Sequence, residues 1–134
     1  MPDLRVSPTA AQGRATALVA LLATAGATHL VAPRAYASLI PRGLGDPRPW
    51  VIGSGVAELA CAVAVAIPRT RRAGALATAA LFVGVFPGNV TMALRARSGA
   101  GSALVRAVAW GRLPLQVPLV RWALRVAAEA PRAG

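Results

Sequence analysis

A lone carboxylate, Glu58, lies near the middle of an otherwise uncharged stretch, residues 49–68. An ionised carboxylate is too costly to leave unpaired in an apolar environment, so Glu58 must be either neutral or partnered. Ser54 lies four residues earlier, which places the two side chains on one face of a helix. Such a carboxylate can accept a proton or anchor a ligand through hydrogen bonds. It can also serve packing alone, by holding neighbouring helices in register.

Depth along the expected helices groups further polar residues with Glu58. At 1.5 Å per residue from the side of the chain termini, His29, Ser54 and Asn89 lie ~21–25 Å deep and Glu58 lies ~15 Å deep. A last helix that begins near residue 107 brings two more polar side chains to the same levels, within reach of Glu58. We therefore expect a polar cluster that faces a cavity, formed by Glu58, His29, Asn89, Arg112, Gln116 and Ser54.

Each of these residues also has a role that involves no ligand. Glu58 with Arg112 or Gln116 can lock two helices together, because a small membrane bundle needs hydrogen bonds between its helices. His29 can be an interfacial histidine, and Asn89 can satisfy the backbone at the preceding proline. The sequence has no metal-spaced ligands, phosphate loop or nucleophile elbow, so neither a metal site nor autonomous catalysis is expected.

The elements that must position these residues are long and apolar. Residues 15–33 and 73–94 carry no charge, and residues 49–68 carry only Glu58. A helix needs roughly 20 mostly apolar residues to cross a bilayer. Hydrophobic residues make up 56% of the chain, and its mean hydropathy of +0.57 is well above the range of soluble domains. The composition predicts a membrane protein. A single cysteine, Cys61, excludes an intramolecular disulfide.

The charge of the chain fits a bilayer better than a nucleic acid. Its net charge is +11, and all 15 basic residues are arginines. They flank the apolar stretches, where basic residues orient helices in a membrane, so nucleic-acid binding is not expected. Four spans put eight arginines on the side of the termini and seven opposite, and three of the eight lie within the short turn 68–72. We therefore expect a multi-pass protein of the cytoplasmic (inner) membrane with both termini in the cytoplasm.

The predicted fold class is all-α, an integral membrane antiparallel four-helix bundle. Pro33 should end the first helix, and Pro87 should kink the third. A short amphipathic piece with Tyr36 should lie along the membrane surface at headgroup depth. The predicted parts are a basic N-terminal tail, residues 1–14, a four-helix transmembrane domain, residues 15–127, and a C-terminal tail, residues 128–134.

The fourth helix has two interpretations. Residues 104–126 contain four arginines and two prolines. In one interpretation they span the membrane, with Arg112 and Gln116 buried and Arg121 and Arg125 reaching to the interface. In the other they form an amphipathic helix on the membrane surface. We favour the span, partly for the resemblance described next.

An ordered set of short motifs resembles the DoxX-like family of small four-helix membrane proteins. It covers roughly residues 15–125. Leu30, Tyr36 and Gly88 depart from residues that are frequent in that family, and none of the three is a polar position of the cluster. The matching pieces are Gly26-Ala-Thr-His29 with Pro33 and Tyr36, Ile40-Pro41, Ser54-Gly-Val-Ala-Glu58-Leu, Pro68-Arg-Thr-Arg-Arg72, Val85-Phe-Pro-Gly-Asn89 with Met92, and Arg112-Leu-Pro-Leu-Gln116 with Trp122.

The resemblance implies a four-helix bundle related to small subunits of membrane redox systems, such as thiosulfate:quinone oxidoreductase and methylamine-utilisation accessory proteins. On that basis we expect an accessory subunit of a quinone-linked membrane system, with a lipid bilayer and a membrane or membrane-associated oxidoreductase as partners. A quinone would be held by this chain or by that partner. Two alternatives stay open: a stand-alone binder or carrier of a small apolar molecule, and a purely structural or assembly protein.

Overall fold

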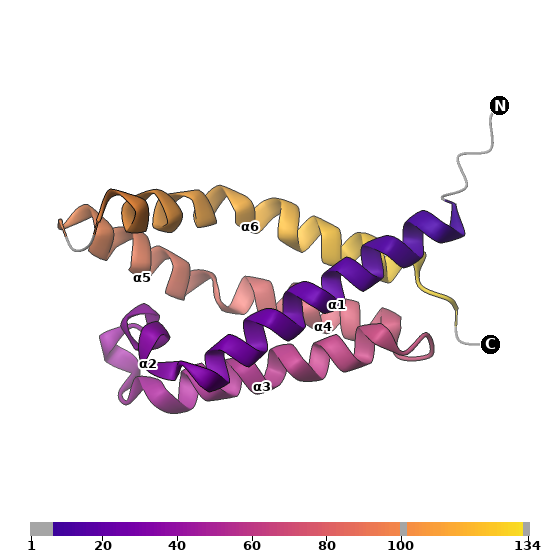
Figure 1. Ribbon diagram of the computed structural model, residues 1–134, viewed down its shortest axis with the longest axis horizontal. Coiled ribbons are helices and arrows are strands. Elements are labelled where there is room, and N and C mark those ends of the chain that lie inside the picture. Colours follow the sequence, from indigo (N-terminus) through magenta and orange to yellow (C-terminus); the bar gives the residue numbers. More distant parts are fainter. Residues whose placement is uncertain (1–6, 100–101, 133–134) are drawn as a thin grey trace.

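The computed structural model describes residues 7–99 and 102–132 and is helical, without strands, over those ranges (Figure 1). The all-helical prediction is therefore confirmed for the part of the chain that the structure describes. The long helices are α1 (Pro8–Val31), α3 (Pro47–Ala66), α4 (Arg71–Gly84), α5 (Phe86–Arg97) and α6 (Ala103–Glu129), and the short ones are α2 (Pro33–Tyr36) and the 3₁₀ turns η1 (Ala37–Leu39) and η2 (Arg42–Leu44).

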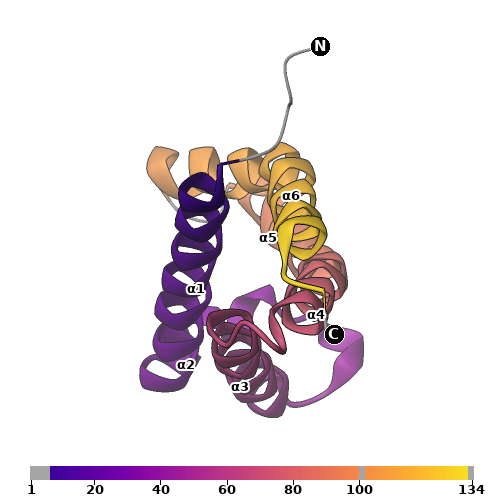
Figure 2. The ribbon, with the colours of Figure 1, turned by 90° about the vertical axis from the view of Figure 1, so that its right-hand side faces the viewer.

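Two pairs of helices form the body of the molecule. Helix α1 packs along α3, and α6 packs along α4 and α5, while α3 and α4 join the pairs. Helices α1 and α6 contact each other less: Figure 1 shows them diverging from the end that holds the chain termini, and Figure 2 shows them side by side, α1 at the left and α6 at the right. Both ends of the described chain lie at the same end as the α3–α4 turn. The opposite end holds α2, the 3₁₀ turns and the α5–α6 connection.

Two glycines bring α1 and α3 close together. A Cβ atom added to Gly26 would lie 2.8 Å from both the Gly55 carbonyl oxygen and Cγ of Leu59. One added to Gly55 would lie 2.8 Å from Cβ of His29 and 3.0 Å from the Gly26 carbonyl oxygen. No ordinary side chain fits at such distances, so the crossing of α1 and α3 requires glycine on both helices.

Two prolines mark places where one helix ends and the next begins. Ala32 closes α1 directly before Pro33, as predicted. The expected third helix, residues 73–94, is instead two helices that meet at Val85, and Pro87 lies in the first turn of α5. A proline in the first turn loses no hydrogen bond, because the first amides of a helix have no acceptor within it. The chain therefore restarts the helix at the proline.

Helix α6 runs without a break through Pro114 and Pro118. Within residues 7–99 and 102–132, three stretches are long and apolar enough to cross a membrane, namely α1, α3 and the α4–α5 pair (71–97), and α6 is not among them. The charges on α6 explain this, since Arg106, Arg112 and Arg121 recur along it. A fourth span therefore remains part of the proposal below.

The apolar core lies at the end of the molecule that holds the chain termini. Leu18 and Leu22 of α1, Val65 of α3, Phe82 of α4 and Val126 of α6 are all buried there. Three polar side chains are buried nearer the other end: Glu58, Asn89 and Gln116. Tight apolar packing thus fixes one half of the bundle, and the buried polar groups lie beyond it.

Candidate functional site

Glu58 of α3 and His29 of α1 form a contact inside the molecule. Nδ1 of His29 lies 2.9 Å from Oε2 of Glu58, and only 8% of the surface of Glu58 is exposed. The same Nδ1 lies 2.7 Å from the carbonyl oxygen of Ala25, one turn earlier on α1. Both neighbours of Nδ1 are oxygen acceptors unless the carboxyl group is protonated. We therefore assign the ring hydrogen to Nδ1, which donates to Ala25.

The contact with Glu58 is close without being a well-directed hydrogen bond. One N–H cannot point straight at two oxygens, and Oε2 is a buried atom with no hydrogen bond of acceptable geometry in the structure. The 2.9 Å separation still makes the two groups strong electrostatic neighbours. We conclude that Oε2 retains the capacity to accept a further hydrogen bond.

The imidazole of His29 is held in place by its own helix and by α2. The ring of Tyr36 stacks on it, with centroids 4.0 Å apart and planes inclined by 27°. The Tyr36 hydroxyl donates to Oγ1 of Thr28 at 2.9 Å, and the Thr28 hydroxyl donates to the Ala25 carbonyl at 2.8 Å. Sequence reasoning placed Tyr36 at headgroup depth but did not foresee this stack. His29 and Tyr36 lie on two different helices separated by Pro33, so no helical spacing in the sequence indicated the stack.

A second buried polar pair links the later helices. Nδ2 of Asn89 on α5 donates to Oε1 of Gln116 on α6 at 3.4 Å. Nε2 of Gln116 in turn donates to the carbonyl oxygen of Phe82, in the last turn of α4. That carbonyl lies just before the break at Val85, where the helix no longer supplies every donor. Gln116 therefore fastens α6 to both sides of the break.

The two remaining residues of the expected cluster make no direct polar contact. Arg112 is half-buried on α6 and acts on His29 only through its charge, and Ser54 is half-buried on α3. Neither side chain has a hydrogen bond or ion pair within residues 7–99 and 102–132. The predicted six-residue cluster is thus divided into two pairs on different helix interfaces and two residues, Arg112 and Ser54, that belong to neither pair. The partner that contacts Glu58 is His29, rather than Arg112 or Gln116.

Neither of the two best-defined pockets adjoins Glu58. One, of about 240 Å³, lies between α2 and the start of α3 and is lined by Pro33, Arg34, Ala37, Pro47 and Arg48. The other, of about 150 Å³, lies at the opposite end and is lined by Gln12, Ala15, Thr16, Val19, Val65, Ala66 and Arg71. In the described part of the chain no three His, Cys, Asp or Glu side chains come together as metal ligands.

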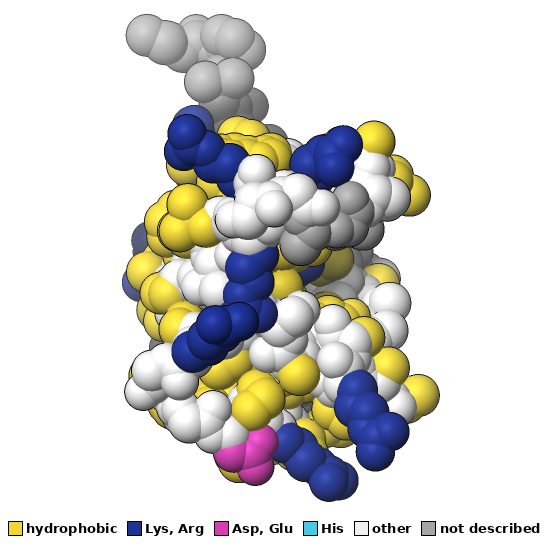
Figure 3. All heavy atoms as spheres, turned by 90° about the vertical axis from the view of Figure 1, so that its left-hand side faces the viewer, with side chains coloured by type: hydrophobic (Ala, Val, Ile, Leu, Met, Phe, Trp, Pro, Cys, Tyr) yellow, Lys and Arg dark blue, Asp and Glu magenta, His cyan; other side chains and the backbone are white. Residues whose placement is uncertain are grey.

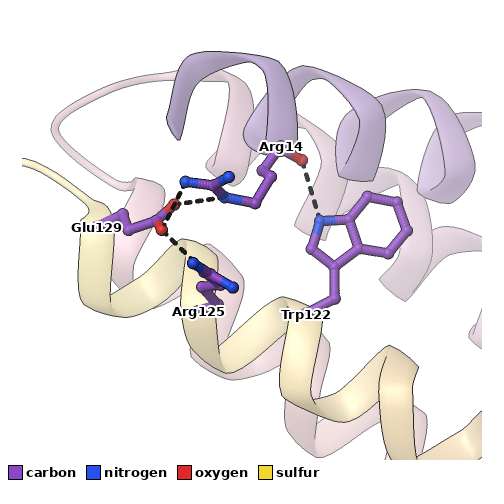
Figure 4. A network of polar contacts seen from close by, with 4 residues as sticks. All are labelled: Arg14, Trp122, Arg125 and Glu129. Atoms are coloured by element: carbon purple, nitrogen blue, oxygen red, sulfur yellow. Dashed lines mark hydrogen bonds and ion pairs between the residues drawn. The ribbon is translucent and has the colours of Figure 1, made fainter. Parts of the chain in front are cut away.

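An ion-pair network at the end of the chain termini was not foreseen from the sequence (Figure 4). Arg14 donates to both carboxylate oxygens of Glu129, at 2.9 and 2.7 Å, and Arg125 donates to the same carboxylate at 3.1 Å. The indole of Trp122 donates to the Arg14 carbonyl at 3.2 Å. Hydrogen bonds from Arg14, followed by those from Arg125, lower the pKa of Glu129 below its ordinary value of 4.5. The network ties the start of α1 to the end of α6.

The fold and these contacts define the class of protein: an all-helical chain with three stretches of membrane-spanning length and a buried imidazole–carboxylate contact between two of them. The chain belongs to the family of the domain of unknown function DUF8561, whose family model matches residues 18–127. That range includes both buried polar pairs and excludes Arg14 and Glu129. Neither a curated protein nor a solved structure matches the chain.

Proposed function

We propose that this protein is a multi-pass, four-helix bundle of the cytoplasmic membrane. Apolar side chains are exposed on every long helix, which suits contact with lipid rather than water. Figure 3 shows arginines around the end that holds α2 and the α5–α6 connection, where lipid headgroups would lie. Helix α6, which would be the fourth span, exposes Leu104, Val108, Trp110, Leu115, Val117 and Leu124.

The orientation in this proposal rests on the short connection between α3 and α4. That connection and the first turn of α4 carry Arg69, Arg71 and Arg72. Basic residues in short loops are retained on the cytoplasmic side, so both termini would face the cytoplasm.

We further propose that the His29–Glu58 pair binds the polar head of a small apolar molecule, with a quinone in its reduced, quinol form as the first candidate, because both free positions of the pair accept hydrogen bonds. The observation that carries this proposal is Oε2 of Glu58, a buried oxygen that lacks a directed donor. With Nδ1 protonated, Nε2 of His29 is the ring atom that can accept a hydrogen bond, and it has no partner within the described residues. Quinol hydroxyls could donate to Oε2 and to Nε2, and the carboxylate would stabilise the imidazolium if a proton followed to Nε2.

Such chemistry suits an accessory subunit of a quinone-linked membrane redox system. The pair can bind the head of a quinol and accept its proton, while electrons would pass to the oxidoreductase partner. The likeness to DoxX-like proteins supports this assignment. A stand-alone carrier would use the same pair for an apolar ligand without any protein partner.

A structural role is the second candidate, and the glycine contact favours it. The pair lies beside the crossing of Gly26 and Gly55, so the attraction between His29 and Glu58 can hold α1 against α3. In this case Glu58→Gln would weaken the fold, because the amide keeps one oxygen but loses the charge opposite the imidazole. Ligand binding would then be absent from the wild-type protein.

Purification in mild detergent, followed by analysis of bound lipids and proteins, tests the functional proposal. We expect the wild-type protein to retain quinone and an oxidoreductase. The Glu58→Gln protein should retain at least about tenfold less quinone, because a charged hydrogen-bond partner is lost. Glu129→Gln is the matched control, because it makes the same change in another long helix, α6, at the end of the molecule opposite to the His29–Glu58 pair. The proposal fails if neither quinone nor an oxidoreductase is enriched over the Glu58→Gln protein.

A further inference from the structure

Arg71, at the start of α4, is a buried cation. Only 8% of its surface is exposed, although arginine is among the residue types least often buried. Its Nε donates to the Val65 carbonyl at 2.8 Å, Nη1 donates to Oε1 of Gln12 at 2.9 Å, and Nη2 donates to the Ala66 carbonyl at 3.2 Å. All three acceptors are neutral, so hydrogen bonds hold the guanidinium while its charge lacks a counter-ion among the residues that the structure describes.

None of the acids that the structure describes neutralises Arg71. Glu129 is already shared by Arg14 and Arg125, and Asp46 caps the opposite end of α3. Glu58 lies with His29 further along the bundle. Because a guanidinium keeps its charge under all physiological conditions, a buried one with no carboxylate partner is energetically unfavourable.

The last carbonyls of α3 compensate part of this charge. Val65 and Ala66 lie in the final turn of that helix, where the backbone dipoles concentrate negative potential. Capping of α3 accounts for one N–H on Nε and one on Nη2, and the bond to Gln12 accounts for one on Nη1. A guanidinium has five N–H donors, so two of them, one on each Nη, remain beyond these three hydrogen bonds. Capping therefore explains the position of Arg71 without using its full capacity to bind an anion.

The guanidinium lines the cavity of about 150 Å³ between α1 and the end of α3. That volume far exceeds the ~10–15 Å³ that one water molecule needs. Gln12, Thr16 and Arg71 supply its polar wall, and Ala15, Val19 and Val65 supply its apolar wall. A cavity with a cation at one side and methyl groups at the other matches an amphiphile in which an oxyanion adjoins a hydrocarbon.

We propose that this cavity binds a phosphate oxyanion, with Arg71 as its counter-ion. The phosphodiester of an anionic phospholipid fits best, because the apolar wall can take the first carbons beyond the phosphate and Arg72, next to Arg71 on α4, adds positive charge at this end of the molecule. Free inorganic phosphate shares the chemistry of the oxyanion. This site lies at the opposite end from His29 and Glu58 and is independent of the function proposed for them.

Lipid binding by the full chain in detergent micelles tests the proposal. Native mass spectrometry would measure retained phosphatidylglycerol and phosphatidylcholine, and thermal unfolding would be followed with and without inorganic phosphate. Arg71→Gln removes the charge, and Thr16→Trp fills the cavity while leaving Arg71 in place. Thr24→Trp is the matched control, because Thr24 is also exposed on α1 but does not line the cavity.

The wild-type and Thr24→Trp proteins should retain phosphatidylglycerol in preference to phosphatidylcholine, and Arg71→Gln and Thr16→Trp should each retain it at least about tenfold less. If inorganic phosphate alone raises the unfolding temperature of wild type but not of these two variants, the ligand is free phosphate and the oxyanion site stands. Retention of phosphatidylglycerol by Thr16→Trp equal to that of wild type, with no effect of phosphate, overturns the proposal. Thr16→Trp decides the matter if Arg71→Gln does not fold.

Discussion

The contact between α1 and α3 allows a sharp test of what holds His29 against Glu58. In Gly55→Ala the new Cβ would lie 2.8 Å from Cβ of His29 and 3.0 Å from the Gly26 carbonyl oxygen. Neither atom is the flexible end of a side chain, so the two helices must move apart. Because the His29–Glu58 contact is only 2.9 Å long, the same movement would lengthen it.

Gly53 supplies the matched control on the same helix. An added Cβ there meets no atom within 4 Å. Both substitutions gain the same helix propensity, up to ~1 kcal/mol for a helical glycine replaced by alanine. The difference between them therefore isolates the packing cost, which for overpacked sites is ~1–3 kcal/mol. Gly53→Ala should be neutral or stabilising, and Gly55→Ala should be less stable than Gly53→Ala by that amount.

Reversible unfolding of the two variants in detergent micelles, followed by circular dichroism, measures this difference. Equal stability of Gly55→Ala and Gly53→Ala would refute the close crossing of α1 and α3. A Gly55→Ala protein that is destabilised by the expected amount but binds quinone as wild type does would show that binding does not depend on the close approach of the two helices.

Two further predictions concern the polar contacts away from Glu58. The pKa of Glu129 is lowered in the folded protein, so its pairing with Arg14 stabilises the fold above the ordinary pKa of 4.5, and this stabilisation is lost as the pH falls through and below that value. Thermal unfolding from pH 7 to pH 3 should show the loss as a fall in the unfolding temperature, and the fall should be smaller in Arg14→Gln. The same dependence of unfolding temperature on pH in Arg14→Gln as in wild type would contradict the assignment. Gln116→Leu should destabilise the protein by ~1–3 kcal/mol, because the buried amide of Asn89 would lose its acceptor. If Asn89→Leu lowers the free energy of unfolding of the Gln116→Leu protein as much as it lowers that of wild type, the two residues are not coupled.

Patterns along single helices could be predicted from the sequence. Apolar stretches between arginines indicated the long helices, and Pro33 and Pro87 marked places where a helix had to end or bend. The isolated carboxylate of Glu58 indicated a buried group in need of a partner, and depth arithmetic put His29 within one or two turns of it. These inferences use distances along one helix axis, which the rise per residue fixes.

Contacts around the helix axes could not be predicted in the same way. Depth arithmetic ordered Glu58, Arg112 and Gln116 along the bundle but gave no rotation of one helix against another. The Gly26–Gly55 crossing sets that rotation and turns Glu58 toward α1, whereas Gln116 faces the break between α4 and α5. The pairing of Arg14 with Glu129 joins opposite ends of the sequence, and no local pattern announces it.

The most direct test of the central claim is the thermal stabilisation of the purified protein by a short-chain quinol that is kept reduced throughout the measurement. A ligand present at about 100 times its dissociation constant stabilises a folded protein by ~2.7 kcal/mol, and a variant that cannot bind gains nothing. We predict a rise in the unfolding temperature for wild type and for Glu129→Gln, each against its own ligand-free value, and no rise for Glu58→Gln or His29→Gln. The same rise in Glu58→Gln as in wild type would contradict a role for the His29–Glu58 pair in binding.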